Sequence, residues 1–348
     1  MTARPEISLQ SLSFRVVTLR SRHVSNRSSI DNSCRVLRLT QPAGVTATLV
    51  YLDLVPQQLM WLDRRGARSS TVGQPYEGVY YPALSPKLDR IAVETLENGN
   101  QDVWVIDITR ATRVRLNSHP ASEVLPVWSP DGTQVAFSSY RAGNTDIFVR
   151  PADGSSDEIT LTSEPKNERV CDWSADGQHI LYSREHPQTR NDLWYLKRNT
   201  SGGWDRVLFL NSASNEKVAK FSPDGRHVAY ISDESGRDEL YVRQFPSGAS
   251  RWPISNGGAS QVRWSRRGSE LFYVQAGSLL AVTVTAGAGF AVGSPTRLFS
   301  HFAFTASLDP NYDVSADGQR FLIPQRVQSE TPKIRVVQNW IGEFQERR

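Results

Sequence analysis

A short phrase returns six times along this chain, and it limits the possible folds more than any other feature. Each copy has an aromatic or branched residue, then a serine, then a tight-turn element, then a hydrophobic strand. The serines are Ser85, Ser129, Ser174, Ser222, Ser265 and Ser315. A repeat of about 45 residues is typical of the four-stranded blade of a β-propeller. The sequence therefore predicts an all-β protein, a β-propeller of six to seven four-stranded blades.

The second copy, Trp128–Gly132, shows why the phrase makes a turn. Pro130 pre-sets its φ angle, the Asp131 carboxylate can accept hydrogen bonds from nearby backbone N–H groups, and Gly132 tolerates positive φ. Four copies keep the serine, the aspartate and the glycine, and we assign these residues a structural role in the turn. They are Ser129, Asp131, Gly132, Ser174, Asp176, Gly177, Ser222, Asp224, Gly225, Ser315, Asp317 and Gly318.

Two copies depart from the pattern. The first has Lys87, Leu88 and Asp89 where Asp-Gly is expected, and the fifth has Arg266 and Arg267 before its glycine. Losing the aspartate removes one local hydrogen-bond acceptor, which costs little if the turn is exposed.

The two ends of the repeat predict how the ring closes. Residues 47–52, 59–63 and 334–340 also look like strands, and joining strands from both chain ends into one blade abolishes the open sheet edge. The extra strands leave six or seven blades, and we favour seven. We expect a basic, poorly patterned lead-in over 1–42, a single propeller over 43–342 and a tail over 343–348.

Charge and hydropathy exclude some partners. The net charge of +4 on 348 residues is small and diffuse, which is poor evidence for nucleic-acid binding. The sequence shows neither a signal peptide nor an apolar run long enough to span a membrane. We expect a monomer without a nucleic-acid partner or membrane span. As written it would be cytoplasmic, or periplasmic if it is a fragment of a membrane-anchored parent.

The Ser-Pro-Asp-Gly turn, followed by a strand and then by Asp, a hydrophobic residue, an aromatic residue and Val, resembles the repeat of TolB-like propellers. Segments 59–66, 282–299 and 336–340 resemble the C-terminal sensor propeller of certain bacterial serine/threonine protein kinases. The kinase motifs His-Arg-Asp and Asp-Phe-Gly are absent from this sequence. This resemblance implies a detached or truncated propeller. TolB-like propellers serve as protein-interaction platforms, sensor domains or gating domains, so the resemblance implies binding of a protein or peptide.

No motif in the sequence predicts catalysis or a cofactor. There is no Gly-x-Ser-x-Gly nucleophile elbow, the six histidines have no metal-ligand spacing, and Cys34 and Cys171 fit no metal or redox pattern. We therefore expect no catalytic residue, metal or cofactor. Two alternatives stay open: a propeller-type glycan hydrolase or lyase, and an inactive remnant of a sensor kinase. An enzyme would need two carboxylates facing each other across the funnel, for which Glu123 and Glu168 are the candidates.

Propeller ligands usually bind at the funnel where the innermost strands begin. Aligning the blades places a set of mixed charges and tyrosines at that mouth, which suits a peptide or protein partner. The candidate binding residues are Tyr80, Tyr81, Glu123, Glu168, Arg169, Lys217, Gln261, Asn311 and Tyr312.

Overall fold

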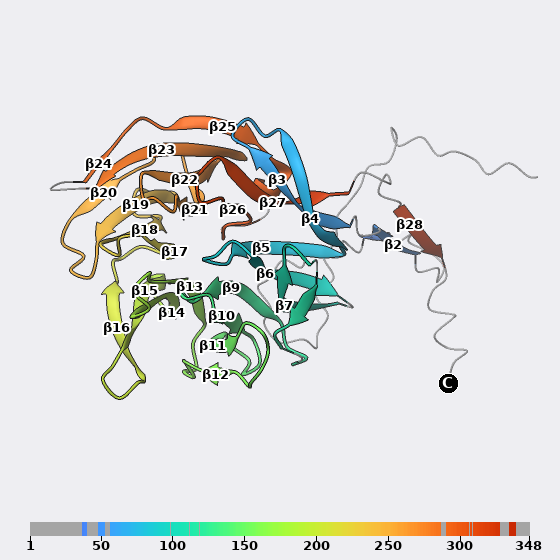
Figure 1. Cartoon of the computed structure of the whole chain (residues 1–348), viewed down its shortest axis with the longest axis horizontal. Helices are drawn as coiled ribbons and strands as arrows, with labels where there is room; N and C mark the ends of the chain where they lie inside the picture. Colours follow the sequence, from blue (N-terminus) through green and yellow to red (C-terminus); the bar gives the residue numbers. More distant parts are fainter. Residues whose placement is uncertain are drawn as a thin grey trace, which may run out of the picture. The chain divides into compact units, whose positions relative to one another are not determined.

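Six antiparallel sheets, five with four strands and one with an additional fifth strand, form the propeller in the computed structural model of the chain (Figure 1). The structure describes residues 56–327 apart from 98, 111, 118, 287–289, 306 and 308, together with the three short strands β1, β2 and β28. Residues 56–327 make one compact unit. Most of the lead-in over 1–42 and the whole tail over 343–348 lie outside the described residues.

Blades 1 to 3 follow the order of the chain, each running outward from its inner strand. Blade 1 consists of β5 (Gly78–Leu84), β6 (Arg90–Glu97), β7 (Asn100–Asp107) and β8 (Arg113–Arg115). Blade 2 consists of β9 (Glu123–Trp128), β10 (Gln134–Ser139), β11 (Asp146–Pro151) and β12 (Ile159–Thr160). Blade 3 consists of β13 (Glu168–Trp173), β14 (His179–His186), β15 (Arg190–Arg198) and β16 (Trp204–Leu210).

Blades 4 and 5 continue the same plan. Blade 4 consists of β17 (Glu216–Phe221), β18 (His227–Ser232), β19 (Glu239–Gln244) and β20 (Arg251–Pro253). Blade 5 consists of β21 (Ser260–Trp264), β22 (Glu270–Gln275), β23 (Ser278–Ala286) and β25 (Thr296–Ser300), with β24 (Phe290–Val292) as an additional strand on β23.

Blade 6 closes the ring with strands from both ends of the chain, as predicted. Its inner strands are β26 (Asp313–Val314) and β27 (Arg320–Arg326), and its outer strands are β3 (Gln57–Asp63) and β4 (Arg68–Tyr76). Figure 1 shows β27, late in the colour scale, beside the blue β3. In their register Phe321 lies opposite Leu62.

The preference for seven blades is wrong. The two end segments do form strands, β2 (Thr48–Leu52) and β28 (Ile334–Gln338), but Val50 pairs with Val336 and the strands belong to no blade. With β1 (Leu37–Leu39) they form a separate three-stranded sheet. Their hydrophobic, β-branched composition predicts strands without saying which partner each one takes.

The apolar core is divided into six clusters, one in each seam between adjacent blades. In the seam of blades 1 and 2, Val103 and Val105 pack with Trp128, Val135 and Phe137. The repeated aromatic residue thus packs between its own blade and the preceding one. The Trp128 indole also donates a 2.8 Å hydrogen bond to the Ala83 carbonyl of blade 1.

The turns of copies 2, 3, 4 and 6 share one hydrogen-bond pattern. The serine hydroxyl donates to the aspartate at 2.5–2.6 Å and accepts the N–H of the residue five positions on at 2.9 Å. The glycine has a φ of 70–72° and donates its N–H to the serine carbonyl. This positive φ explains why a glycine stands there.

The two departing copies build the turn differently. In copy 1, Leu88 takes the positive φ, at 61°, and Asp89 accepts from the Ser85 hydroxyl at 2.7 Å. In copy 5, Arg266 reaches past blade 6 to blade 1. It donates to the carbonyl oxygens of Leu84, Ser85 and Pro86 at 3.1–3.3 Å. The arginine at this position therefore ties two non-adjacent blades together.

Candidate functional site at the mouth of the channel

The inner strands carry an irregularity near the end where they begin. In four blades the pairing with the second strand shifts, and a residue other than glycine has positive φ: Tyr81 at 50°, Leu125 at 58°, Val218 at 53° and Gln261 at 55°. This conformation is unfavourable, above all for a β-branched residue, and needs the surrounding structure to hold it. Strain of this kind clusters at ligand sites, which draws attention to this end of the channel.

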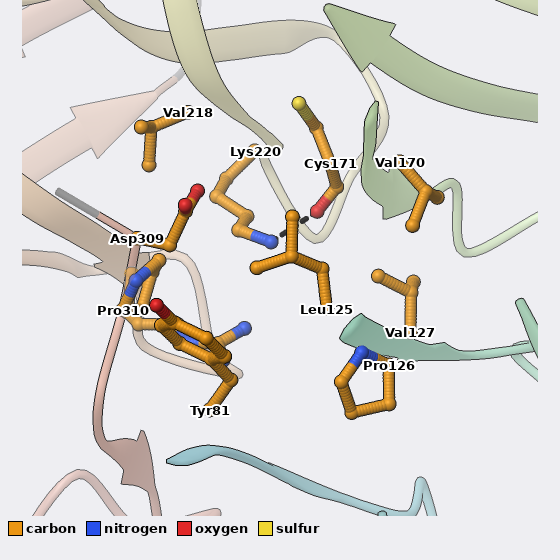
Figure 2. A pocket seen from close by; sticks show the side chains of 11 residues that line it. Tyr81, Leu125, Pro126, Val127, Val170, Cys171, Val218, Lys220, Asp309 and Pro310 are labelled. Atoms are coloured by element: carbon orange, nitrogen blue, oxygen red, sulfur yellow. Dashed lines mark hydrogen bonds between the residues drawn. The ribbon is translucent and has the colours of Figure 1, made fainter. Parts of the chain in front are cut away.

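A small cavity of about 20 Å³ lies between the inner strands (Figure 2). Its lining mixes apolar side chains with charged ones. Figure 2 shows Tyr81, Asp309 and Pro310 together on one side, and Lys220 reaching toward the Cys171 carbonyl oxygen. The space suffices for about one water molecule. A larger ligand can therefore occupy this cavity only if part of the lining moves.

The residue before each repeated aromatic position lies on the inner strand. These residues are Ala83, Val127, Asp172, Lys220, Arg263 and Asp313. The two acids accept backbone N–H groups of a neighbouring blade, Asp172 from Phe221 at 2.8 Å and Asp313 from Leu84 at 2.7 Å. The set thus contains two cations, Lys220 and Arg263, and two carboxylates that each accept a backbone N–H group.

The connection from β25 to β26 crosses the mouth. We call its described residues, 301–305, 307 and 309–312, the mouth segment. Its C-terminal part is firmly anchored, because Asn311 donates to Gln261 at 3.0 Å and the Tyr312 hydroxyl donates to the Gln261 carbonyl at 2.8 Å. Toward its middle, Ser307 shares a 3.1 Å hydrogen bond with the Tyr81 hydroxyl, and Asp309 forms a 3.4 Å ion pair with Arg169 of blade 3.

Glu94 is a buried carboxyl group at the same mouth, and sequence analysis did not single it out. It is 1% exposed, accepts from Gln101 at 2.7 Å, and its Oε2 has no hydrogen-bond partner among the described residues. Burial raises the pKa of Glu94 to about 8, while Arg169 acts in the opposite direction. The available signal was its position: Glu94 stands on the second strand where blade 2 has Ser138, which accepts the Val170 N–H.

The predicted site residues separate into two groups. Glu123, Glu168, Gln261, Asn311 and Tyr312 are at most 5% exposed, whereas Tyr80, Tyr81, Arg169 and Lys217 are partly exposed. The structure brings Tyr81, Arg169, Gln261, Asn311 and Tyr312 together through the mouth segment. Tyr80 lies against Tyr81 with ring centroids 6.2 Å apart, and Lys217 pairs with Asp238 at 2.9 Å.

Glu123 and Glu168 have their contacts in different blades. Glu123 accepts from Ser139 at 3.2 Å and lies 3.4 Å from Arg141, both in blade 2 or its connecting turn. Glu168 lies 3.4 Å from Arg184 of blade 3. Burial raises the pKa of Glu123 to about 7 and also raises that of Glu168. Each carboxylate thus pairs with an arginine next to its own blade's strands, and each of these arginines also pairs with a second glutamate.

Neither a metal-binding cluster nor a membrane-spanning helix is found in the described part of the chain. There, no three histidine, cysteine, aspartate or glutamate side chains come together as a metal ion would require. No helix among these residues has the length and apolarity needed to cross a membrane.

Comparison with known proteins agrees with the geometry. Residues 81–203 match the family model of the tricorn protease N-terminal beta propeller domain. The Tol-Pal system protein TolB of Alcanivorax borkumensis is 27% identical over 108 residues, which make up 29% of this chain and 25% of that protein. The match thus spans about a quarter of the relative's length.

Solved structures share the architecture at low sequence identity. A TolB structure from Agrobacterium tumefaciens has a TM-score of 0.61 at 16% identity and covers 79% of this chain and 99% of its own. An oligogalacturonate lyase in complex with manganese has a TM-score of 0.50 at 11% identity, covering 87% of this chain and 96% of its own. The chain therefore has the fold of a TolB-like β-propeller with six blades.

Proposed function

We propose that this chain is a non-catalytic binding module whose mouth recognises a protein or peptide. The observation that carries the proposal is that Tyr81 and Arg169, partly exposed on inner strands of blades 1 and 3, both contact the middle of one segment, at Ser307 and Asp309. Aromatic residues and arginine dominate the energetics of protein interfaces. The similarity to TolB proteins favours the same reading. The resemblance to sensor-kinase propellers adds a sensor role, or a remnant of one, to this proposal.

The proposal includes a monomer that acts without nucleic acid. The outer strands β8, β12 and β20 are only two or three residues long, and short edge strands limit pairing between sheets of different molecules. Light scattering of the purified chain measures the mass directly, and a dimer would contradict this part.

An enzyme is the second candidate, and one observation favours it. Glu94 is a buried carboxyl group whose pKa is raised to about 8 by burial, and strongly shifted groups of this kind cluster at catalytic sites. A lyase also occurs on this architecture. Release of products from oligogalacturonate and other glycans, measured for the full chain and for Glu94→Gln, tests this candidate. Turnover that the variant loses would favour the enzyme.

The main test uses the full chain as bait in a lysate of its source, followed by mass spectrometry and by direct binding of each retained protein. We expect a retained protein to be lost with Tyr81→Ala. The matched control is Ile159→Ser, which changes a 62% exposed side chain on the outer strand β12. Retention that is equally sensitive to both variants, or to neither, would place binding away from the mouth.

A further inference from the structure

The contact between Asp309 and Arg169 has the form of a ligand contact made by the chain itself. We propose that Asp309 occupies the place of a partner's carboxylate on Arg169, and that the partner is a peptide whose acidic side chain or C-terminal carboxylate displaces it. This inference rests on the proposed function and names the chemistry of its partner.

Arg169 is incompletely paired. A guanidinium presents five donors in a fork that matches a carboxylate in a bidentate arrangement. Here Nη2 meets Asp309 at 3.4 Å, and the buried Nε has no partner among the described residues. The side chain remains 41% exposed. A carboxylate free to align with the fork would therefore bind Arg169 better than Asp309 does.

Among the described residues, Asp309 contacts the blades through its side-chain ion pair with Arg169. The roots of the segment are buried, with Gln261 donating to the carbonyl oxygens of Phe304 and Ser307 and with Tyr312 fully buried. The side chains of Ser307 and Asp309 contact the blades through the hydrogen bond to Tyr81 and the ion pair to Arg169. Partly exposed ion pairs contribute little to stability, so this one can exchange without unfolding the ring.

The charged side chains that line the cavity with Asp309 allow another carboxylate to take its place. Lys220 and Arg263 line the cavity with Asp309, and Lys220 is 8% exposed. The acids at the same level, Asp172 and Asp313, already accept backbone N–H groups. Glu94 adds no full negative charge at neutral pH because burial raises its pKa to about 8. Arg263 also lies 3.8 Å from Asp313, and Lys220 donates to the Cys171 carbonyl. A carboxylate that displaces Asp309 therefore takes the place of one negative charge beside Arg169, and the net charge of the lining stays the same.

The test selects peptides on the immobilised full chain from two random 12-residue libraries, one displayed with free C-termini and one with C-termini fused to the carrier. Enrichment in the first library alone indicates a terminal carboxylate, and enrichment of Asp or Glu in both indicates a side chain. Selected peptides are then synthesised and their affinities measured by fluorescence anisotropy.

We expect Arg169→Gln to weaken binding at least tenfold and Asp309→Asn to strengthen it about three- to tenfold, since the internal competitor is removed. Replacing the peptide's carboxylate by its amide should match the loss in Arg169→Gln. Arg65→Gln is the matched control, because it removes one positive charge from an 89% exposed side chain in the turn between β3 and β4. Melting curves confirm that each variant is folded.

The outcomes separate the two proposals. One contradicting result is a set of peptides that lose affinity with Tyr81→Ala but contain no carboxylate. Another is equal affinity of a peptide for the Arg169 and Asp309 variants. Either result overturns this inference but leaves the proposed binding function supported. Affinity that Asp309→Asn leaves unchanged or weakens also overturns it. Selection that yields no mouth-dependent peptide at all counts against the binding function and this inference together.

Discussion

The two ends of the channel are built from different kinds of chemistry. At the turn end, Ser, Asp and Gly recur with nearly identical geometry, and every serine hydroxyl of copies 2, 3, 4 and 6 is engaged. At the mouth end, Tyr81, Glu94, Arg169 and Asp309 have no counterpart that repeats from blade to blade, and Glu94 and Arg169 keep unpartnered polar atoms among the described residues.

The difference separates what builds the fold from what is available for binding. A satisfied polar group that recurs in each repeat contributes to stability and has little left to offer a ligand. An unsatisfied group in a strained setting is costly, and persists where the surrounding structure holds it for another purpose. Substitutions at the turn end should therefore change stability, and substitutions at the mouth should change binding.

The largest expected effect is at the turn end of blade 2. Trp128→Ala should lower the free energy of unfolding by about 3–5 kcal/mol, because it empties the seam between blades 1 and 2 and leaves the Ala83 carbonyl without its donor. Urea denaturation followed by circular dichroism measures the change. A loss below about 1 kcal/mol would show that this seam does not carry the stability that its burial indicates.

Serine substitutions in single turns should lower the free energy of unfolding less than Trp128→Ala does, and by equal amounts. Ser129→Ala should cost about 1–2 kcal/mol, since the serine hydroxyl accepts the Gln134 N–H and donates to Asp131. Ser174→Ala and Ser222→Ala, measured in the same denaturation assay, should cost the same within error. Costs that differ widely between the three copies would break the equivalence of the turns.

Glu94 at the mouth should make the stability of the folded chain depend on pH. The folded pKa of Glu94, about 8, lies above its ordinary value of 4.5, so between these values the folded state holds a proton that the unfolded chain has released. Its contribution is complete below the unfolded pKa and is lost as pH rises toward 8. We expect the melting temperature to fall between pH 6.5 and 8.5, and to fall less in Glu94→Gln.

The control for this prediction is Glu77→Gln, which changes an exposed carboxylate. A wild-type melting temperature that rises across the same pH range would contradict the sign. Histidine acts in the opposite direction at lower pH: burial lowers the pKa of His179, so stability from that group is lost as pH falls below its ordinary value of 6.5.

The smallest expected effect on stability belongs to the mouth ion pair. Asp309→Asn should change the free energy of unfolding by at most about 1 kcal/mol, because a partly exposed pair is screened by solvent. The same denaturation assay measures it. A loss as large as that of Trp128→Ala would make the pair part of the structural framework and would erase the contrast between the two ends.

The turn end was predictable from sequence, and the mouth was not. The turns are local, so Ser, Asp and Gly within four residues fix hydrogen bonds and a positive φ. Blade alignment also predicted that Tyr81 and Arg169 lie near each other, and in the structure both contact the mouth segment. The sequence did not predict Glu94 as a site residue, because its environment depends on Arg169 and Asp309, which come from other parts of the chain. The burial of Glu123 and Tyr312 was not predictable either, since the sequence of an inner strand does not show how deeply a charged or hydroxyl side chain is buried.

The number of blades also depends on contacts between distant parts of the chain, here on which strands pair with each other. The hydrophobic strand Gln57–Asp63 could precede a blade of its own or complete the last one, and only its register with Arg320–Arg326 decides between them. Local pattern predicts that both are strands. It contains no information on which partner each finds.

The pairing of β27 with β3 makes the last step of construction an encounter between distant pieces of chain. During synthesis β3 emerges first and its partner emerges only after five blades have been made, so the edge of β3 waits unpaired. A waiting edge is a template for the wrong strand, including that of another molecule. Bringing together ends so far apart along the chain also slows folding more than it lowers final stability. A propeller of this design is thus most exposed to misassembly in the interval before its last blade is complete.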